Sequence, residues 1–124
     1  MLLSPLFIAV SVMGQAEKVV RVPTYKHVAY GSHKDMKLNF WKIDSEKPTP
    51  LLVHIHGGGW LGGKKHETIS PNQLKNGYSY ASIDYRLAGT ELLPAAVHDA
   101  ARAIQFLRTK AKEWNFDPKR IAVT

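Results

Sequence analysis

Residues 51–60 read LLVHIHGGGW, a mostly apolar run of six residues followed by three glycines and a tryptophan. A continuous apolar run of this length is typical of a strand that is buried on both faces, as in a parallel sheet. The two prolines of PTP at residues 48–50 interrupt the chain just before it. The segment therefore predicts a buried strand that opens directly into a glycine-rich turn.

Four further runs of strand-forming residues surround this segment. Residues 25–30 and 38–43 are separated by a Gly-Ser pair and a polar stretch, which predicts an antiparallel hairpin. Residues 80–85 and 121–124 each predict another strand on the C-terminal side.

Two helices are expected between these strands. The clearer one covers residues 94–114, where Pro94 suits the first turn and apolar side chains recur on one helical face. Those side chains are Val97, Ala100, Ala101, Ile104, Leu107, Ala111 and Trp114. The other lies between residues 67 and 76 and is interrupted by Pro71. The order of the elements predicts an α/β fold, whose sheet has an antiparallel hairpin followed by parallel strands with crossover helices.

The composition is that of an ordinary globular protein with one domain at most. The chain has 124 residues, 44% of them hydrophobic and 22% charged, so the disordered and collagen-like classes are excluded. It has no cysteine, which excludes disulfide frameworks, thiol catalysis and zinc ribbons. The net charge of +7 is dispersed over single and paired basic residues, so a nucleic-acid partner is not expected.

The first 16 residues, MLLSPLFIAVSVMGQA, contain no charged side chain. Their apolar run, residues 2–13, is shorter than the about 20 residues that a membrane span needs. Small residues stand before Glu17, where a signal peptidase would cleave. We expect residues 1–16 to be a secretory signal peptide that directs the protein to a periplasm or the exterior, without a stable membrane anchor.

The three glycines that follow the buried strand have a chemical use. Gly57, Gly58 and Gly59 place no side chain between their NH groups and whatever lies above the strand end. NH groups that converge on an oxygen as it becomes negative form an oxyanion hole. With His56 before the glycines and Trp60 after them, the pattern favours such a site over a plain connecting turn.

The HGGGW pentapeptide resembles the oxyanion motif of the α/β-hydrolase fold, in the esterase and lipase group that includes relatives of hormone-sensitive lipase and feruloyl esterases. Further motifs stand in the family's order: VAYG at residues 28–31, DYRL at residues 84–87, and LPAA at residues 93–96 followed by Asp99. The resemblance covers residues 25–124. It implies the amino-terminal part of an α/β-hydrolase sheet.

The resemblance also implies roles for the motif residues. Gly58 and Gly59 would supply the oxyanion NH groups, and Gly57 would shape the turn. His56 would brace the loop by hydrogen bonding, and Trp60 would either line the substrate pocket or pack in the core.

Three charged residues of the other motifs are expected to be structural. Asp84 and Arg86 would form an ion pair or brace a turn, and Asp99 would anchor the end of a helix.

The family's nucleophile lies in G-x-S-x-G on the turn after the fifth strand, and this chain ends at Thr124, where that turn would begin. We therefore expect residues 17–124 to be an incomplete domain that ends at the fifth strand and is inactive alone. GYSYA at residues 77–81 leads into a strand, so Ser79 is not expected to be the nucleophile. The implied reaction is hydrolysis of a small ester by acyl transfer to a serine beyond Thr124, without a cofactor or metal.

Two functions of other classes stay open. His54 and His56 lie two residues apart on one strand and so on one face, as in hydrolases that bind a metal ion through H-x-H. That interpretation leaves the glycines and Trp60 unexplained. The chain could instead be a finished, non-catalytic module for ligand or protein binding, in which residues 121–123 would form an unpaired, aggregation-prone edge.

Overall fold

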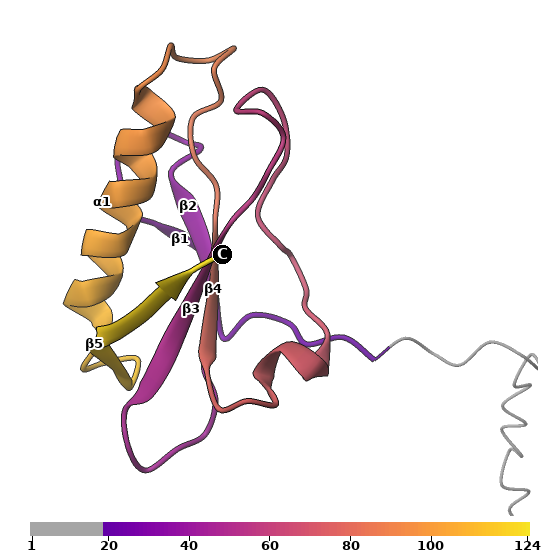
Figure 1. Ribbon diagram of the computed structural model, residues 1–124, viewed down its shortest axis with the longest axis vertical. Coiled ribbons are helices and arrows are strands. Elements are labelled where there is room, and N and C mark those ends of the chain that lie inside the picture. The colour runs from indigo at the N-terminus through magenta and orange to yellow at the C-terminus, as the bar shows by residue number, and fades with distance from the viewer. Residues whose placement is uncertain (1–18) are drawn as a thin grey trace, which may run out of the picture.

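The computed structural model describes residues 19–124, and the predicted signal peptide lies outside the described residues. The described chain forms one five-stranded sheet, one α-helix and one short 3₁₀ turn (Figure 1). The strands are β1 (Tyr25–Ala29), β2 (Lys37–Trp41), β3 (Thr49–Ile55), β4 (Ser79–Ile83) and β5 (Phe116–Val123). All five correspond to strands predicted from the sequence, with shifted ends.

The sheet is mixed, with the strand order β1-β2-β4-β3-β5. β2 pairs antiparallel with both β1 and β4, whereas β3 pairs in parallel with both β4 and β5. The predicted α/β class with an antiparallel start is therefore confirmed. Because parallel strands end at the same edge of a sheet, the segments that follow β3 and β4 lie close to the end of β5.

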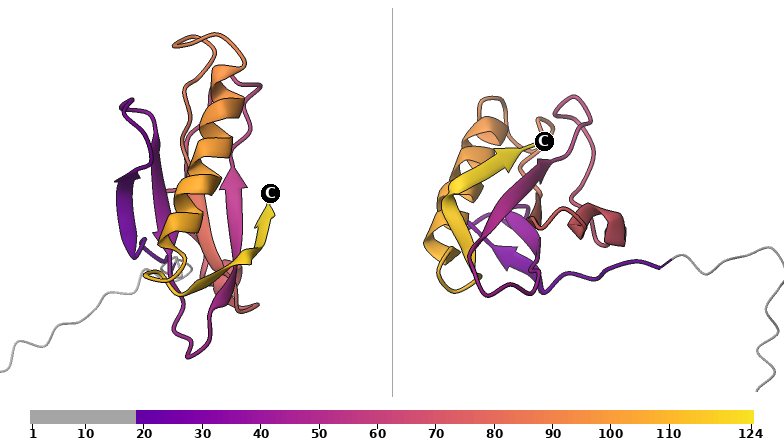
Figure 2. Two further views of the ribbon diagram at one scale, coloured as in Figure 1. Left: turned by 90° about the vertical axis from the view of Figure 1, so that its left-hand side faces the viewer. Right: turned by 60° about the horizontal axis from the view of Figure 1, so that its bottom comes forward.

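Helix α1 (Ala95–Lys110) lies across one face of the sheet (Figure 2). Its inward stripe contains Ala100, Ala103 and Leu107, which pack against the strands in the main core. The predicted stripe is therefore partly wrong, because Val97 is 49% exposed. Small alanine side chains allow the helix to lie close to the strands, so the alanine-rich face is the inward one.

The helix also ends earlier than the sequence predicts. Its last residue is Lys110, and the chain then turns through Asn115, which has a φ of +58°. The regular pattern stops at Ala111, whose NH donates to the Arg108 carbonyl three residues back instead of to a carbonyl four residues back. Trp114, predicted as the last residue of the helical face, nevertheless packs in the same core from this turn.

The opposite face of the sheet carries a smaller core of Trp41, Ile69 and Tyr80. The 3₁₀ turn η1 (Pro71–Leu74) packs near it, and Ser70 caps the turn through a capping box. No residue of η1 is buried, so no apolar face stabilises a longer helix here. The helix predicted between residues 67 and 76 is wrong beyond this single turn.

Strand β5 begins at Phe116, earlier than the predicted residue 121. The predicted part pairs regularly with β3, and a register shift separates it from the pair formed by Phe116 and Thr49. The strand starts earlier because the Phe116 side chain, which is 2% exposed, packs in the main core. Within the described residues β5 pairs only with β3, so it forms one edge of the sheet.

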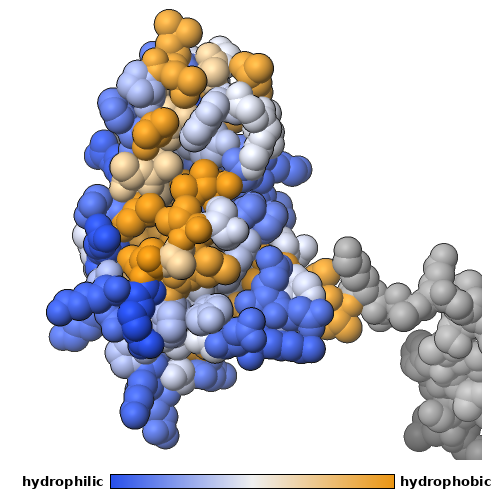
Figure 3. Space-filling model, viewed as in Figure 1, coloured by the Kyte–Doolittle hydropathy of each residue, from blue (hydrophilic) through white to orange (hydrophobic). Residues whose placement is uncertain are grey.

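Apolar side chains also reach the surface. They gather at the top of the molecule and over its middle in Figure 3. The loop before α1 contributes Leu92 and Leu93, which are 78% and 51% exposed. Among residues 19–124, no helix combines the length and the apolar character needed to cross a membrane.

Candidate active site

The glycine loop follows β3 at the sheet edge where the parallel strands end. Three consecutive residues have left-handed backbone angles, with φ of +126° at Gly58, +62° at Gly59 and +67° at Trp60. Glycine adopts such angles readily, whereas a tryptophan there must be held by its surroundings. The loop is therefore a defined conformation and not a simple extension of the strand.

Gly58 is the glycine that the loop requires most strictly. A Cβ atom on Gly58 would lie 2.2 Å from the carbonyl oxygen of Gly62. The Gly58 carbonyl accepts hydrogen bonds from the NH groups of Leu61 and Gly62 at 3.1 and 3.2 Å. A Cβ atom on Gly57 or Gly59 would meet no atom within 4 Å.

The NH groups of Gly58 and Gly59 are available to a ligand. Both residues are exposed, and within residues 19–124 neither NH group donates a hydrogen bond to another group of the protein. Successive NH groups of this kind form a concave site for an anion. The arrangement is suited to the oxyanion role, which stays a prediction.

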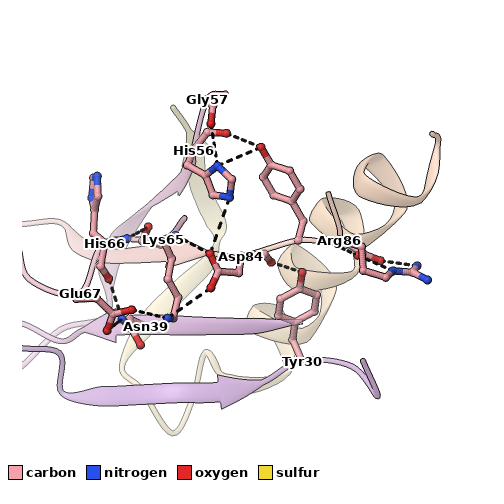
Figure 4. Close-up of polar contacts among 12 residues, drawn as sticks. Tyr30, Asn39, His56, Gly57, Lys65, His66, Glu67, Asp84 and Arg86 are labelled. Carbon is pink, nitrogen blue, oxygen red and sulfur yellow. Dashed lines mark hydrogen bonds and ion pairs between the residues drawn. The ribbon is translucent and has the colours of Figure 1, made fainter. Parts of the chain in front are cut away.

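His56 lies beneath the loop and is 7% exposed. Its Nδ1 lies 2.9 Å from the Gly57 carbonyl oxygen (Figure 4). Because a carbonyl oxygen only accepts, Nδ1 carries the hydrogen in this contact. The contact is of the kind expected from the predicted bracing role of His56.

Tyr85 supports His56 from the segment after β4. The two rings stack with their centroids 4.2 Å apart, and the Tyr85 hydroxyl donates to the His56 carbonyl oxygen at 2.7 Å. Burial, followed by the nearby charge of Asp84, raises the pKa of Tyr85. The hydroxyl therefore keeps its proton and stays a donor at neutral pH.

The other side of the His56 ring faces a cluster of charged groups. Its Nε2 lies 3.9 Å from Asp84 Oδ1, and this carboxylate oxygen accepts a hydrogen bond from the Lys65 backbone NH at 2.6 Å. The Lys65 side chain is 5% exposed, with its Nζ 3.5 Å from Asp84 Oδ2 and 2.7 Å from Glu67 Oε1. The hydrogen bond from Lys65 is the main reason that the pKa of Glu67 lies below its usual value.

Sequence reasoning assigns no role to Lys65. It stands in a Lys64-Lys65 pair, and such pairs are typical of a solvated surface. Lys64 is indeed exposed, and only the tertiary structure distinguishes the buried lysine from its neighbour.

A second ion pair fastens helix α1. Arg86 donates to both carboxylate oxygens of Asp99, from Nε at 2.9 Å and from Nη2 at 2.8 Å, and its backbone NH donates at 2.9 Å. Burial alone would raise the pKa of Asp99, but the hydrogen bonds from Arg86 outweigh it and lower the pKa. Asp99 therefore anchors the helix as expected. The predicted ion pair between Asp84 and Arg86 is wrong, because Asp84 pairs with Lys65 and Arg86 pairs with Asp99.

Trp60 belongs to neither buried core, so the expected core packing is not found, and its place at a substrate pocket stays a prediction. Its side chain packs over Tyr85, with the ring centroids 5.4 Å apart, and yet the residue is 37% exposed. Leu61 beside it is 74% exposed, and the Trp60 carbonyl accepts from Ala88 at 2.7 Å. An apolar surface thus adjoins the free NH groups of the loop.

The other candidate residues lie away from this arrangement. Ser79 is fully buried in β4, where its hydroxyl lies 2.9 Å from the hydroxyl of Thr49, so a substrate cannot reach it. The His54 ring stacks on His66 at 4.3 Å, and burial is the main reason that the pKa of His54 is lowered. Residues 19–124 contain no group of three or more histidine or acidic side chains placed to hold a metal ion.

Comparison with known proteins gives similarities across most of the described chain. The family model described as BD-FAE matches residues 40–124. Carboxylesterase NlhH of Mycobacterium tuberculosis is 33% identical over 100 residues, which cover 77% of this chain and 31% of the relative. The chain thus spans less than a third of the length of this curated relative.

The solved structures that are similar to this one include two hydrolases. A truncated carbohydrate esterase from gut microbiota has a TM-score of 0.72 at 24% identity, covering 87% of this chain and 40% of that one. An acetyl ester-xyloside bifunctional hydrolase from Caldicellulosiruptor lactoaceticus has a TM-score of 0.62 at 28% identity, covering 86% of this chain and 41% of that one.

Proposed function

Because this chain belongs to the BD-FAE family, a family of esterases like hormone-sensitive lipase, we propose that it forms the oxyanion-binding part of a serine carboxylester hydrolase. The membership confirms the family resemblance that the HGGGW motif indicates. The observation that carries the proposal is the pair of free NH groups at Gly58 and Gly59, presented on left-handed backbone at the end of a buried strand.

In the proposed reaction a serine hydroxyl gives its proton to a histidine and forms a bond to the carbonyl carbon of the ester. The carbonyl oxygen then becomes negative, and the NH groups of Gly58 and Gly59 donate hydrogen bonds to it. The histidine returns the proton to the alcohol as the ester bond breaks. Water releases the acid from the serine by the same two steps, so no cofactor is needed.

We propose that the serine, together with the acid and histidine that activate it, belongs to sequence that follows Thr124 in a longer protein. The position of Thr124 supports this. Its NH donates to Val53 and its carbonyl accepts from Ile55, both at 2.9 Å. A turn that continued from Thr124 would therefore start beside the end of β3, next to the glycine loop.

The proposed substrate is a carboxylic ester with a short acyl group. Carboxylesterase NlhH and the acetyl ester-xyloside hydrolase from Caldicellulosiruptor lactoaceticus support this class. The exposed side chains of Trp60 and Leu61 offer an apolar surface for the acyl or alcohol part.

Expression of the gene's full reading frame tests the proposal. The folded protein should hydrolyse 4-nitrophenyl acetate and be labelled covalently by a fluorophosphonate probe. Heat-denatured protein serves as the control and should show neither signal. A cooperatively melting protein with neither hydrolysis nor labelling would overturn the proposed function.

Export is a separate part of the proposal. Residues 1–16 are uncharged and apolar, which supports a signal peptide and a secreted or periplasmic enzyme. Amino-terminal sequencing of protein recovered outside the cytoplasm should begin at Glu17. Protein that still begins at Met1 would contradict it.

A further inference from the structure

Lys65 carries an ammonium group in a place where such a group is costly. The side chain is 5% exposed, and a buried charge is tolerated only when nearby groups compensate it. Asp84 and Glu67 provide the compensation, at 3.5 and 2.7 Å from Nζ. The ester chemistry proposed above gives Lys65 no direct part, so its burial needs another reason.

The segment that carries Lys65 packs against the glycine loop. Gly63 has a φ of +94°, and a Cβ atom there would lie 2.3 Å from the Gly57 carbonyl oxygen and 2.4 Å from His56 Nδ1. Two residues later the Lys65 backbone NH donates to Asp84 at 2.6 Å. The backbone of residues 63–65 therefore touches both the loop and the carboxylate behind it.

A continuous series of contacts leads from Lys65 to the loop, as Figure 4 shows. The Lys65 ammonium faces Asp84, whose Oδ1 lies 3.9 Å from His56 Nε2. His56 Nδ1 in turn donates to the Gly57 carbonyl at 2.9 Å. The Gly57 carbonyl and the Gly58 NH belong to one planar peptide unit, so the direction of the carbonyl sets the direction of that NH group.

The distance between His56 and Asp84 shows what the ammonium contributes. At 3.9 Å the two side chains are too far apart for a hydrogen bond. Lys65 Nζ, 3.5 Å from Asp84 Oδ2, is a cation that compensates the carboxylate without contacting His56. Without Lys65, the Asp84 carboxylate would shift to find other donors, and a shift against His56 would turn Nδ1 away from the Gly57 carbonyl.

We infer that Lys65 is a positioning residue for the oxyanion loop, acting through Asp84 and His56 to hold the peptide unit of Gly57 and Gly58 in its binding orientation. The inference rests on the proposed function for its effect on catalysis. It also predicts an effect on the loop itself that can be measured without a substrate.

The kinetic test uses the full-length protein and a double-mutant cycle of Lys65→Met and Asp84→Asn. Lys65→Met should lower kcat for 4-nitrophenyl acetate between about 10- and 100-fold, as expected for a displaced catalytic group, with KM changed less, whereas Asp84→Asn should change kcat little because it removes the charge that Lys65 compensates. The double variant should be no slower than Asp84→Asn alone, because both changes act through one contact. Wild-type kcat in Lys65→Met, or losses that multiply in the double variant, would overturn the inference.

The matched control is Lys64→Met, the same change at the exposed neighbour, which should keep the wild-type kcat. If Lys65→Met does not melt cooperatively, Lys65→Gln replaces it in the cycle, since an amide of similar length can still donate to both carboxylates. Because the amide carries no charge, a normal kcat in folded Lys65→Gln would also overturn the inference.

Hydrogen exchange separates this inference from the proposed function. The NH groups of Leu61, Gly62 and Ala88 close the loop by hydrogen bonds and should be protected in the wild type. Their exchange should be at least about ten times faster in Lys65→Met, because loop opening becomes easier, and unchanged in Lys64→Met. Unchanged exchange in Lys65→Met would refute the positioning role even if the protein proves inactive on esters.

Discussion

Asp84 and Arg86 stand two residues apart after β4, yet they belong to two different regions of the molecule. Asp84 joins Lys65 beside His56 and the glycine loop, where the cation is buried and the carboxylates are partly exposed. Arg86 joins Asp99 on α1, where the carboxylate is 1% exposed and the guanidinium 27% exposed. The first region holds a loop whose NH groups are free, and the second holds a helix to the sheet. We therefore expect changes in the first to affect activity and changes in the second to affect stability.

The largest effect is expected from Asp99→Ala. The change removes three hydrogen bonds from Arg86 and leaves its guanidinium without the buried partner. The guanidinium left behind is 27% exposed and can be solvated, so the loss comes from the three hydrogen bonds at about 1 kcal/mol each, on the order of 3 kcal/mol of the free energy of unfolding. Urea denaturation of the full-length protein measures this loss, and kcat of the folded protein should change little.

Asp99→Asn is the control for this prediction. The amide keeps the shape and one acceptor oxygen, so the loss of stability should be smaller than for alanine. Equal stability of Asp99→Ala and the wild type would show that the Arg86 contact does not anchor the helix.

The next largest effect is expected from Gly58→Ala in the loop region. A Cβ atom there would approach the Gly62 carbonyl to 2.2 Å, so the loop must move. Loss of one oxyanion donor lowers kcat by about 100-fold or more. Steady-state kinetics on 4-nitrophenyl acetate measure the effect.

Two neighbouring glycines provide a graded control. The Cβ atom added by Gly59→Ala would have no atom within 4 Å, but the alanine would have to adopt a φ of +62°. The Cβ atom added by Gly57→Ala would also have no atom within 4 Å, and Gly57 has no positive φ. We expect the loss of kcat to fall in the order Gly58, Gly59, Gly57. A loss at Gly57 as large as that at Gly58 would contradict the loop geometry.

A smaller effect is expected from Tyr85→Phe, which tests the boundary between the two regions. The change keeps the stack on His56 but removes the hydrogen bond to its carbonyl, a loss of about 1 kcal/mol. Because that bond holds the base of the loop, kcat should fall about five-fold. Tyr30→Phe is the matched control, since the Tyr30 hydroxyl donates to the Asp84 carbonyl and supports the fold without touching the loop. A lower kcat in Tyr30→Phe than in Tyr85→Phe would argue against the distinction.

The smallest effect is a dependence on pH that belongs to the helix region. Asp99 has a lowered pKa in the folded state, so its contribution to stability is present above the pKa of the unfolded chain. The contribution is lost as the pH falls through the folded value. The difference in unfolding free energy between wild type and Asp99→Asn should therefore be constant near neutral pH and shrink below about pH 4. A difference that grows on acidification would contradict the assignment.

Much of the fold is predictable from local patterns. The apolar run of residues 51–56 predicts β3, and the alternation of residues in the hairpin predicts β1 and β2. Local patterns do not predict which face of a helix is buried when two faces carry similar apolar residues, because packing against the sheet decides it. Val97 and Ala103 both suit an apolar helical face, and the closer approach that alanine allows makes Ala103 the buried one.

The candidate site was predictable only in part, for the same reason. The HGGGW motif identifies His56 and the glycines, because the residues that form this part of the site are adjacent in the sequence. No local motif identifies the ion-pair partners of Asp84 and Arg86, because these partners are distant in the sequence. Lys65 is 19 residues from Asp84, and Asp99 is 13 residues from Arg86.

The sequence by itself determined the strands, the long helix and a glycine turn whose residues suit an oxyanion site. Each of these features depends on residues that are close together in the chain. Only the tertiary structure decided which lysine is buried, which carboxylate it meets and which charge fastens the helix. These choices follow from burial, because a charge removed from water must find a partner among whatever groups the folded sheet brings near it.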